Sequence, residues 1–342
     1  RTQCKASSSC CRQGGDCGVS RLSGSLTPSR FCPLSPPLLH EGGFGIVTKC
    51  CNTKTNKVVA IKVNKSDPEI LQQAKMEIYI LEKLRGLDAD RCNIVKWNDF
   101  FIDGDRICLN FELLDESLWQ YMRYRRNRVL PVTEIRPVLF QLANALSHLG
   151  SLGIVHADLK PGNIMVVDRY ECPIKVKLID FGLACPASTV IPGDCVGTVG
   201  YKAPEVMIGS LFNEAIDMWS LGLVALATGY PFYPGRNDYD VLKFIIQTQG
   251  QPPDHSNDTR SIKLKCLDDL GLLLSIMWGR EKIQNVFVSL IKEMLALDPN
   301  QPAPIMITLA FLSFLIFTPP PQPVATDGCP FKSLVLSKVS SF

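Results

Sequence analysis

The hydrophobic pattern of this chain changes near residue 116, and that change constrains the fold more than any other feature. Before it, residues 46–63 predict a β-hairpin that turns at a polar NTKTNK segment, and residues 94–114 predict a second hairpin with Asp103-Gly104 at its turn. Apolar residues at helical spacing predict one helix between them, at residues 68–85. The first part of the chain is therefore expected to be mainly sheet with one helix.

Beyond residue 116, helical periodicity dominates. Five apolar residues fall on one face of a predicted helix: Leu139, Leu142, Ala143, Leu146 and Leu149. This helix is expected to end at Gly150–Gly153. Further helices are predicted at residues 214–228, 238–248, 282–296 and 303–316. A sheet-rich part followed by a helical part favours an α+β fold, and 342 residues leave room for two lobes.

The two ends of the chain differ from its middle. Residues 1–33 are rich in Ser, Gly and Cys without a sustained period, which is typical of a disordered segment. The PPPQP stretch is expected to end the fold and to leave residues 318–342 as a loose tail. The predicted folded domain therefore covers residues 34–317, with lobes at 34–114 and 115–317.

Composition argues against several classes of protein. A net charge of +3 does not favour direct binding to nucleic acid or to a membrane surface. The longest apolar run, at residues 305–317, is too short to span a bilayer, and residues 1–20 lack the apolar core of a secretory signal. The 14 cysteines show no paired C-x-x-C spacing, so reduced thiols are favoured over a zinc site. We expect a monomer that is neither secreted nor transmembrane.

Three features of the first part could hold a nucleotide. Glycines in EGGFGIV, at residues 41–47, lie in a turn between strands, where backbone N–H groups can approach phosphate oxygens. Lys62 follows on the next strand, and Glu77 lies in the middle of the predicted helix. Each feature alone would be an ordinary turn or a surface charge. Together, Glu77 would pair with Lys62 and align it on the α- and β-phosphates of ATP.

The second part supplies HADLKPGN at residues 156–163 and LIDFG at residues 178–182. Phosphoryl transfer depends mainly on positioning and charge neutralisation. Asp158 would accept the proton of the attacking hydroxyl, and Lys160 would neutralise the phosphoryl group in flight. Asn163 and Asp180 would supply hard oxygen ligands, which suit a Mg²⁺ ion that bridges phosphates.

These segments follow the order of the protein kinase signature. HADLKPGN resembles the catalytic loop H-R-D-L-x-x-x-N, and APE at residues 203–205 and DMWSLG at residues 217–222 follow at the expected places. The ordered set is far more specific than any single motif. The resemblance implies the bilobal protein kinase fold, in which a small, mainly antiparallel β N-lobe with one regulatory helix precedes a larger helical C-lobe. It also implies ATP and Mg²⁺ as cofactors.

The resemblance extends to one subfamily. HADLKPGNIM, EAIDMWSLG, YPFYPGRNDYD and IIQTQGQP are similar to the homeodomain-interacting protein kinases over roughly residues 38–317. That implies a nuclear or cytoplasmic serine/threonine kinase with protein substrates, among them transcription regulators. It also implies a hinge at residues 111–122, with Phe111 as gatekeeper, and a hydrogen bond between Thr198 and Asp158. Nucleotide contacts are then expected from Gly42, Gly43, Gly45, Val47, Ala60, Lys62, Glu112, Leu114 and Met165.

Three departures concern regulation. Ala157 replaces the arginine of the general kinase motif, as it does in this subfamily, so no activation-loop phosphate is expected to be read there. Cys195 stands where the subfamily autophosphorylates a tyrosine, and a thiol does not replace phosphotyrosine. Val199 stands where the wider group has an arginine that favours proline after the target residue.

Other departures leave alternatives open. His40 replaces the first glycine of the nucleotide loop, and Pro302 replaces an arginine that would pair with Glu205. A pseudokinase, or a truncated nucleotide-binding scaffold with little activity, is therefore an alternative. The intact metal ligands oppose it, because a scaffold does not require them. A third alternative is redox regulation through a disulfide between Cys185 and Cys195, whose geometry the sequence does not fix.

Overall fold

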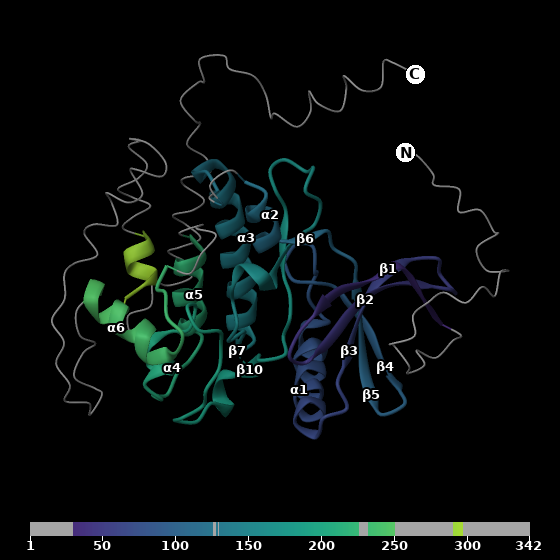
Figure 1. Ribbon diagram of the computed structural model, residues 1–342, viewed down its shortest axis with the longest axis horizontal. Helices are drawn as coiled ribbons and strands as arrows, with labels where there is room; N and C mark the ends of the chain where they lie inside the picture. Colours follow the sequence, from purple (N-terminus) through teal and green to yellow (C-terminus); the bar gives the residue numbers. More distant parts are fainter. Residues whose placement is uncertain (1–29, 126–127, 129, 226–231, 250–289, 297–342) are drawn as a thin grey trace, which may run out of the picture. The chain divides into compact units, whose positions relative to one another are not determined.

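The computed structural model describes residues 30–125, 128, 130–225, 232–249 and 290–296 of the chain (Figure 1). Contacts between residues divide the chain into two compact units. The first unit comprises Arg1–Gln72 and Trp97–Leu113, and the second comprises Gln73–Lys96 and Leu114–Phe342.

The first unit is built on a five-stranded sheet (Figure 1). In sheet order its strands are β1 (Phe31–Glu41), β2 (Gly45–Asn52), β3 (Val58–Asn64), β5 (Arg106–Glu112) and β4 (Trp97–Asp103). All neighbouring strands are antiparallel. Both predicted hairpins are confirmed, the first as β2–β3 and the second as β4–β5. Asp103 pairs with Arg106, which leaves Gly104 in the second turn with φ of 62°.

Strand β1 starts earlier than the sequence indicates. The predicted disorder of residues 1–33 is wrong for residues 31–33, which lie in β1, while residues 1–29 lie outside the described residues. Phe31 is 3% exposed and stacks on Phe101, with 5.1 Å between ring centroids. One buried aromatic ring therefore anchors the strand at the end of a segment whose Ser, Gly and Cys content predicts disorder. Phe31 belongs to the sheet core, an apolar cluster completed by Cys50, Val59, Ile61, Val63 and Cys108.

The helix predicted at residues 68–85 is confirmed as α1 (Pro68–Leu84). Asp67 precedes it, and its Oδ1 accepts hydrogen bonds from the backbone N–H groups of Glu69 and Ile70, at 2.9 and 3.3 Å. A side-chain acceptor at this position satisfies donors that the first turn leaves without partners. Proline at the first helical position costs nothing, because its missing N–H would have no intrahelical acceptor.

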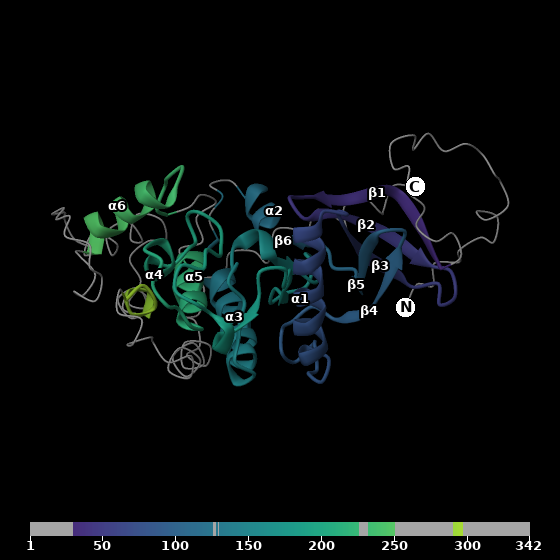
Figure 2. The same ribbon diagram turned by 90° about the horizontal axis from the view of Figure 1, so that it is seen from below.

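The second unit is mainly helical. Besides α1 from Gln73 on and a helical turn at residues 290–294, the helices described in this unit are α2 (Leu118–Arg123), α3 (Val132–Ser151), α4 (Pro204–Met207), α5 (Ala215–Ala225) and α6 (Asp238–Gln249) (Figure 2). Its small sheets are β6–β8–β9 (Glu116–Ser117, Ile164–Val166 and Val176–Leu178) and β7–β10 (Ile154–Val155 and Cys185–Pro186). Two 3-10 turns, η1 (Pro161–Asn163) and η2 (Ala187–Thr189), complete it.

Several helix predictions are confirmed in this unit. The predicted apolar face of α3 is buried throughout, and the helix ends at Ser151 before Gly153, whose φ is 63°. Helices α5 and α6 match the predictions at residues 214–228 and 238–248, except that residues 226–228 lie outside the described residues.

Other sequence predictions fall partly or wholly on residues that the structure does not describe. Of the helix predicted at residues 282–296, residues 290–294 are helical, and residues 282–289 lie outside the described residues. The helix predicted at residues 303–316 and the tail at 318–342 lie there too. Within the described part of the chain, every helix is too short or too polar to cross a membrane.

Candidate active site

The catalytic-loop segment 156–163 runs from β7 into η1 and is anchored from α5. Asp217 of α5 is 2% exposed, and its Oδ2 and Oδ1 accept hydrogen bonds from the backbone N–H groups of His156 and Ala157, at 2.7 and 2.9 Å. Burial raises the pKa of Asp217. Ala157 has a φ of 65°, which is unusual for a residue with a Cβ. The bonds to Asp217 thus hold a backbone conformation that the loop alone would disfavour.

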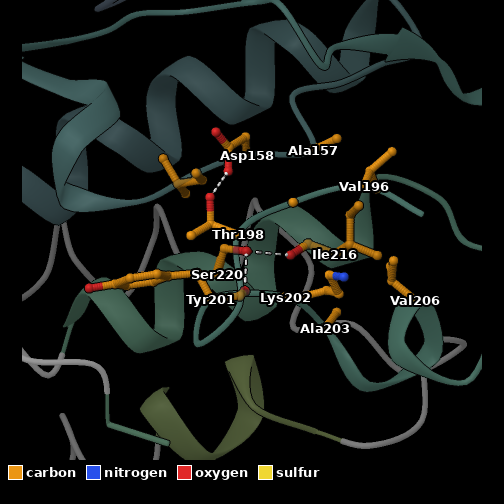
Figure 3. Close-up of a pocket in the computed structure, with 12 residues that line it drawn as sticks. Ala157, Asp158, Val196, Thr198, Tyr201, Lys202, Ala203, Val206, Ile216 and Ser220 are labelled. Carbon is orange, nitrogen blue, oxygen red and sulfur yellow. Dashed lines mark hydrogen bonds between the residues drawn. The ribbon is translucent and has the colours of Figure 1, made fainter. Parts of the chain in front are cut away.

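Four of the predicted site residues meet around one carboxylate. Asp158 is 8% exposed, and its Oδ1 accepts a 2.6 Å hydrogen bond from the Thr198 hydroxyl (Figure 3). Its Oδ2 lies 2.7 Å from Lys160 Nζ and 2.9 Å from Asn163 Nδ2. Lys160 Nζ also donates to Thr198 Oγ1 at 2.7 Å. Three side chains therefore fix the orientation of the Asp158 carboxylate and place a positive charge beside it.

The two predicted metal ligands lie on connected segments. Ile179 N donates to the backbone oxygen of Asn163 at 2.9 Å, which ties the loop after β9 to η1. Asn163 Nδ2 donates to both the backbone oxygen and Oδ2 of Asp158, so its amide oxygen faces away from these bonds. Asp180 has a φ of 61° in the loop that follows β9. An amide oxygen and a carboxylate are the hard ligands that Mg²⁺ prefers, so these residues fit that ion.

The glycine turn joins β1 to β2 in the first unit. Gly42 N donates to Gly45 O at 2.9 Å. A Cβ at Gly45 would lie 2.1 Å from the backbone oxygen of Val63, so no side chain fits there without moving β3. A Cβ at Gly43 would meet nothing within 4 Å. Close approach of two backbones thus explains the glycine at position 45, whereas the space around position 43 is open.

Other predicted nucleotide residues share one face of the same sheet. Val47 pairs with Lys62 and Lys49 pairs with Ala60, so Val47, Ala60 and Lys62 project to the same side. The sheet core lies on the other side. His40 pairs with Val47 in the extended backbone of β1. The non-core face of the sheet therefore presents Val47 and Ala60 together with two lysines, Lys49 and Lys62.

The remaining predicted site residues are divided between the units. Glu112 ends β5 in the first unit, whereas Leu114 and Met165 belong to the second, where Met165 pairs with Ser117 across β6 and β8. Glu77, on α1, is 2% exposed and belongs to the second unit, while Lys62 belongs to the first. The Lys62–Glu77 pair and the nucleotide contacts therefore stay predictions.

The structure shows the surroundings of Cys185, Cys195 and Glu205, the residues on which the regulatory alternatives depend. Cys185 and Cys195 are both free thiols, and burial raises the pKa of Cys185 to about 11. Cys195 Sγ lies 3.4 Å from Lys202 Nζ. Burial raises the pKa of Glu205, whose carboxylate has no ion pair among the described residues. Pro302 lies outside those residues.

Sequence reasoning missed two charged anchors of this site. Asp217 lies within the DMWSLG motif, and the signal that could have identified it is an acidic residue in the first turn of an otherwise apolar helix. Lys202 is buried and paired with Asp238 of α6, at 2.7 Å between Nζ and Oδ2. No local pattern joins two residues 36 positions apart.

A pocket opens beside Asp158 (Figure 3). It lies between the catalytic loop, residues 196–203, α4 and α5, and its cavity volume is about 10 Å³, which is room for one water-sized group. Apolar side chains that line it include Val196, Val206 and Ile216. This shallow hollow with apolar side chains in its lining lies next to the predicted base, Asp158.

Comparison with known families identifies the fold. The protein kinase domain family matches residues 37–307. This chain belongs to that family. The predicted α+β protein kinase fold is thereby confirmed, with the antiparallel sheet in the first unit and most of the helices in the second.

The kinase domain is also similar to curated homeodomain-interacting protein kinases. It is 43% identical to kinase 1 of Caenorhabditis elegans over 217 residues, which are 63% of this chain and 26% of that protein. It is 44% identical to kinase 2 of Mus musculus over 219 residues, or 64% of this chain and 18% of that protein. It is 40% identical to kinase 4 of Homo sapiens over 222 residues, which are 64% of this chain and 36% of that protein. The predicted resemblance is confirmed, and the chain spans only 18% to 36% of these relatives.

Proposed function

We propose that this kinase domain transfers the γ-phosphoryl group of ATP to serine and threonine hydroxyls of protein substrates, with Mg²⁺ as cofactor. The observation that carries the proposal is the convergence of Thr198, Lys160 and Asn163 on the carboxylate of Asp158. A carboxylate held by three donors is oriented before any substrate arrives. Positioning of this kind supplies much of the catalysis in phosphoryl transfer.

Each side chain around the carboxylate then has a separate task. Asp158 orients the substrate hydroxyl and accepts its proton as the new O–P bond forms. Lys160 neutralises charge on the transferring group, because its ammonium lies 2.7 Å from Asp158 Oδ2 and its side chain is 28% exposed. Thr198 keeps the carboxylate and the ammonium in register through one hydrogen bond to each.

The resemblance to protein kinases assigns the proposed nucleotide contacts. Lys62, aligned by Glu77, would pair with the α- and β-phosphates beneath the turn formed by Gly42, Gly43 and Gly45. When bound to Asn163 and Asp180, Mg²⁺ would neutralise the phosphate oxygens. The adenine would lie against the apolar side chains of Val47, Ala60 and Met165 and would exchange hydrogen bonds with the backbone from Glu112 to Leu114.

The substrate class rests on similarity. Lys160 in the catalytic loop resembles the residue that accompanies serine/threonine specificity, and the relatives are named for interaction with homeodomain proteins. Transcription regulators are therefore the proposed substrates, in the nucleus or the cytoplasm. The chain would act as a monomer, and direct binding to nucleic acid or membrane is not part of the proposal.

The test compares the chain with Asp158→Asn in the presence of ATP, Mg²⁺ and a basic protein substrate. Loss of the base should lower transfer by about 10²- to 10⁴-fold, since that is the usual contribution of general base catalysis. Asp105→Asn, an exposed acid in the β4–β5 turn, is the matched control and should retain full activity. Mass spectrometry of the product identifies the modified residues and shows whether proline follows them.

Two results would contradict the proposal. Transfer by Asp158→Asn at the original rate would mean that the assigned base is wrong. Folded protein that transfers no phosphate would be a scaffold. A nucleotide-binding measurement would then show whether this scaffold binds nucleotide. A nucleotide-binding scaffold should gain about 2.7 kcal/mol of stability at 100 times its Kd, measured as a shift in thermal unfolding.

A further inference from the structure

One buried charge supports the wall of the pocket beside Asp158. The side chain of Lys202 is 6% exposed and lines this pocket. Its ammonium lies 2.7 Å from Asp238 Oδ2, at the first residue of α6, and 3.4 Å from Cys195 Sγ. Lys202 therefore joins the segment that begins at Cys195 to the start of α6, which lies 36 residues farther along the chain.

Two hydroxyls that line the pocket, those of Ser220 and Thr198, are already hydrogen-bonded. Ser220 Oγ donates to the backbone oxygens of Tyr201 and Ile216, at 2.8 and 3.1 Å. The Thr198 hydroxyl donates to Asp158 and accepts from Lys160. A ligand side chain would therefore find no unpaired donor or acceptor among these groups. Among the residues that line the pocket, Lys202 carries the positive charge.

An ammonium in this position requires an anion. Burial alone would lower the pKa of Lys202, but the hydrogen bond and charge of Asp238, with a smaller contribution from Cys195, raise it above its ordinary value. In protein switches, a phosphate introduced by modification often supplies the anion that orders a loop around a cation. Here the carboxylate of Asp238 supplies the anion that pairs with Lys202.

The hydroxyls of the segment from Cys185 to Tyr201 are not bonded to Lys202. Ser188 and Thr189 are exposed, and Thr189 Oγ1 donates to the backbone oxygen of Pro186. Thr198 is bonded to Asp158, and burial raises the pKa of Tyr201 to about 12. Within the described residues, the hydrogen bonds from Lys202 Nζ go to Asp238 and Cys195.

We propose that the Lys202–Asp238 ion pair holds the substrate pocket in its working shape without any phosphate on residues 185–201. Asp238 is then a positioning residue for the peptide substrate. This inference rests on the proposed kinase function. It explains how a chain with Cys195 and Ala157 can keep an ordered pocket, since neither side chain can carry or bind a phosphate.

The test measures steady-state kinetics with a serine peptide that has a small apolar residue on each side of the target. Asp238→Asn removes one charge and keeps the shape of the side chain. We expect it to lower kcat/KM for the peptide at least tenfold, mainly through KM, and to change KM for ATP less than twofold. Asp240→Asn removes a charge from the same turn of α6 without touching Lys202, so it should match the parent chain. Asp238→Glu should restore most of the lost efficiency.

Two further variants test the mechanism. Lys202→Met should reproduce the Asp238→Asn defect, and the double variant should be no worse than Lys202→Met alone, because both changes break one interaction. Ser188→Ala combined with Thr189→Val removes the exposed hydroxyls and should leave kcat/KM unchanged after phosphatase treatment. Mass spectrometry must then show residues 185–201 free of phosphate.

The outcomes separate this inference from the proposed function. Unchanged peptide kinetics in Asp238→Asn, or activity that disappears with phosphatase treatment, would overturn the inference while leaving a kinase. If the parent chain transfers no phosphate, the proposed function fails, and peptide affinity measured by fluorescence anisotropy decides the inference. Binding that weakens at least tenfold in Asp238→Asn would support it. Equal binding by both chains, or no binding by either, would overturn it.

Discussion

The glycine turn of the first unit and the catalytic loop of the second are both short connections between strands, but different forces fix them. The turn is held by backbone contacts, through its own Gly42–Gly45 hydrogen bond and the close approach of Gly45 to Val63 on the paired strand β3. The loop is held by a buried carboxylate, Asp217, which lies 61 residues away from His156 along the chain. Backbone sterics between paired strands therefore shape one element, and a distant charged group shapes the other.

This difference predicts where a single substitution does most damage. Asp217→Ala would leave two buried N–H groups, those of His156 and Ala157, without acceptors. Each such group costs about 1–3 kcal/mol, so we expect the free energy of unfolding to fall by about 3 kcal/mol. Relief from burying the Asp217 carboxylate offsets part of the loss. Urea unfolding followed by tryptophan fluorescence measures the effect as a lower midpoint with unchanged slope.

The matched control for this variant is Asp105→Ala, which removes an exposed carboxylate from the β4–β5 turn. We expect its midpoint to stay within experimental error of the parent chain, since surface substitutions usually change stability by less than about 0.5 kcal/mol. If Asp217→Ala had the same urea midpoint as this control, the proposed difference between the turn and the loop would be wrong. The loop would then keep its shape without Asp217.

The glycine turn gives the second prediction. Gly45→Ala would place a Cβ 2.1 Å from Val63 O, and β3 would have to shift. We expect a loss of about 1–3 kcal/mol, the usual cost of forcing an extra carbon into packed structure. Gly43→Ala is the matched control, because a Cβ there meets nothing within 4 Å. Thermal unfolding of the two variants side by side should show a lower Tm for Gly45→Ala alone, and equal Tm values would contradict the steric argument.

The same difference explains how far the sequence could predict this molecule. Both hairpins, α1 and the apolar face of α3 follow from periodicity, because each depends on residues close together in the chain. The order of the motifs correctly indicated that Asp158, Lys160, Asn163 and Thr198 would come together, but only through resemblance to known kinases. Their distances and hydrogen bonds depend on the folded chain.

The failures of sequence reasoning have a common physical cause. Phe31 is buried because it stacks on Phe101, a residue 70 positions later, and the composition of residues 1–33 does not reveal that contact. The pairing of Lys202 with Asp238 likewise joins separate helical and loop segments. Long-range contacts of single residues carry no periodic signal, so sequence patterns predict elements better than the anchors that hold them.

An exposed carboxylate anchor should matter less than the buried Asp217, and Asp115 provides the test. Arg169 bonds both oxygens of Asp115, with Nε 2.8 Å from Oδ2 and a second, shorter contact from Nη2 to Oδ1. These bonds join the start of β6 to the loop that follows β8. The hydrogen bond from Arg169 lowers the pKa of Asp115 below its ordinary value, although burial opposes this.

Asp115→Asn should therefore cost about 1 kcal/mol or less at pH 7, because solvent screens a partly exposed pair. The variant leaves the other ion pair of Arg169 in place, with 3.2 Å between Nη1 and Oε1 of the buried Glu116. Since the folded-state pKa of Asp115 is depressed, the stabilisation is present above the unfolded pKa, near 4, and is lost as pH falls through the lower folded value. Unfolding free energies measured at pH 7, 5 and 3 should converge for the two chains at the acidic end. Glu82→Gln, which breaks an ion pair with Arg85 that is about half exposed on both sides, should show a smaller difference at every pH. A pH-independent loss in Asp115→Asn would mean that Asp115 acts through its hydrogen bonds and not through its charge.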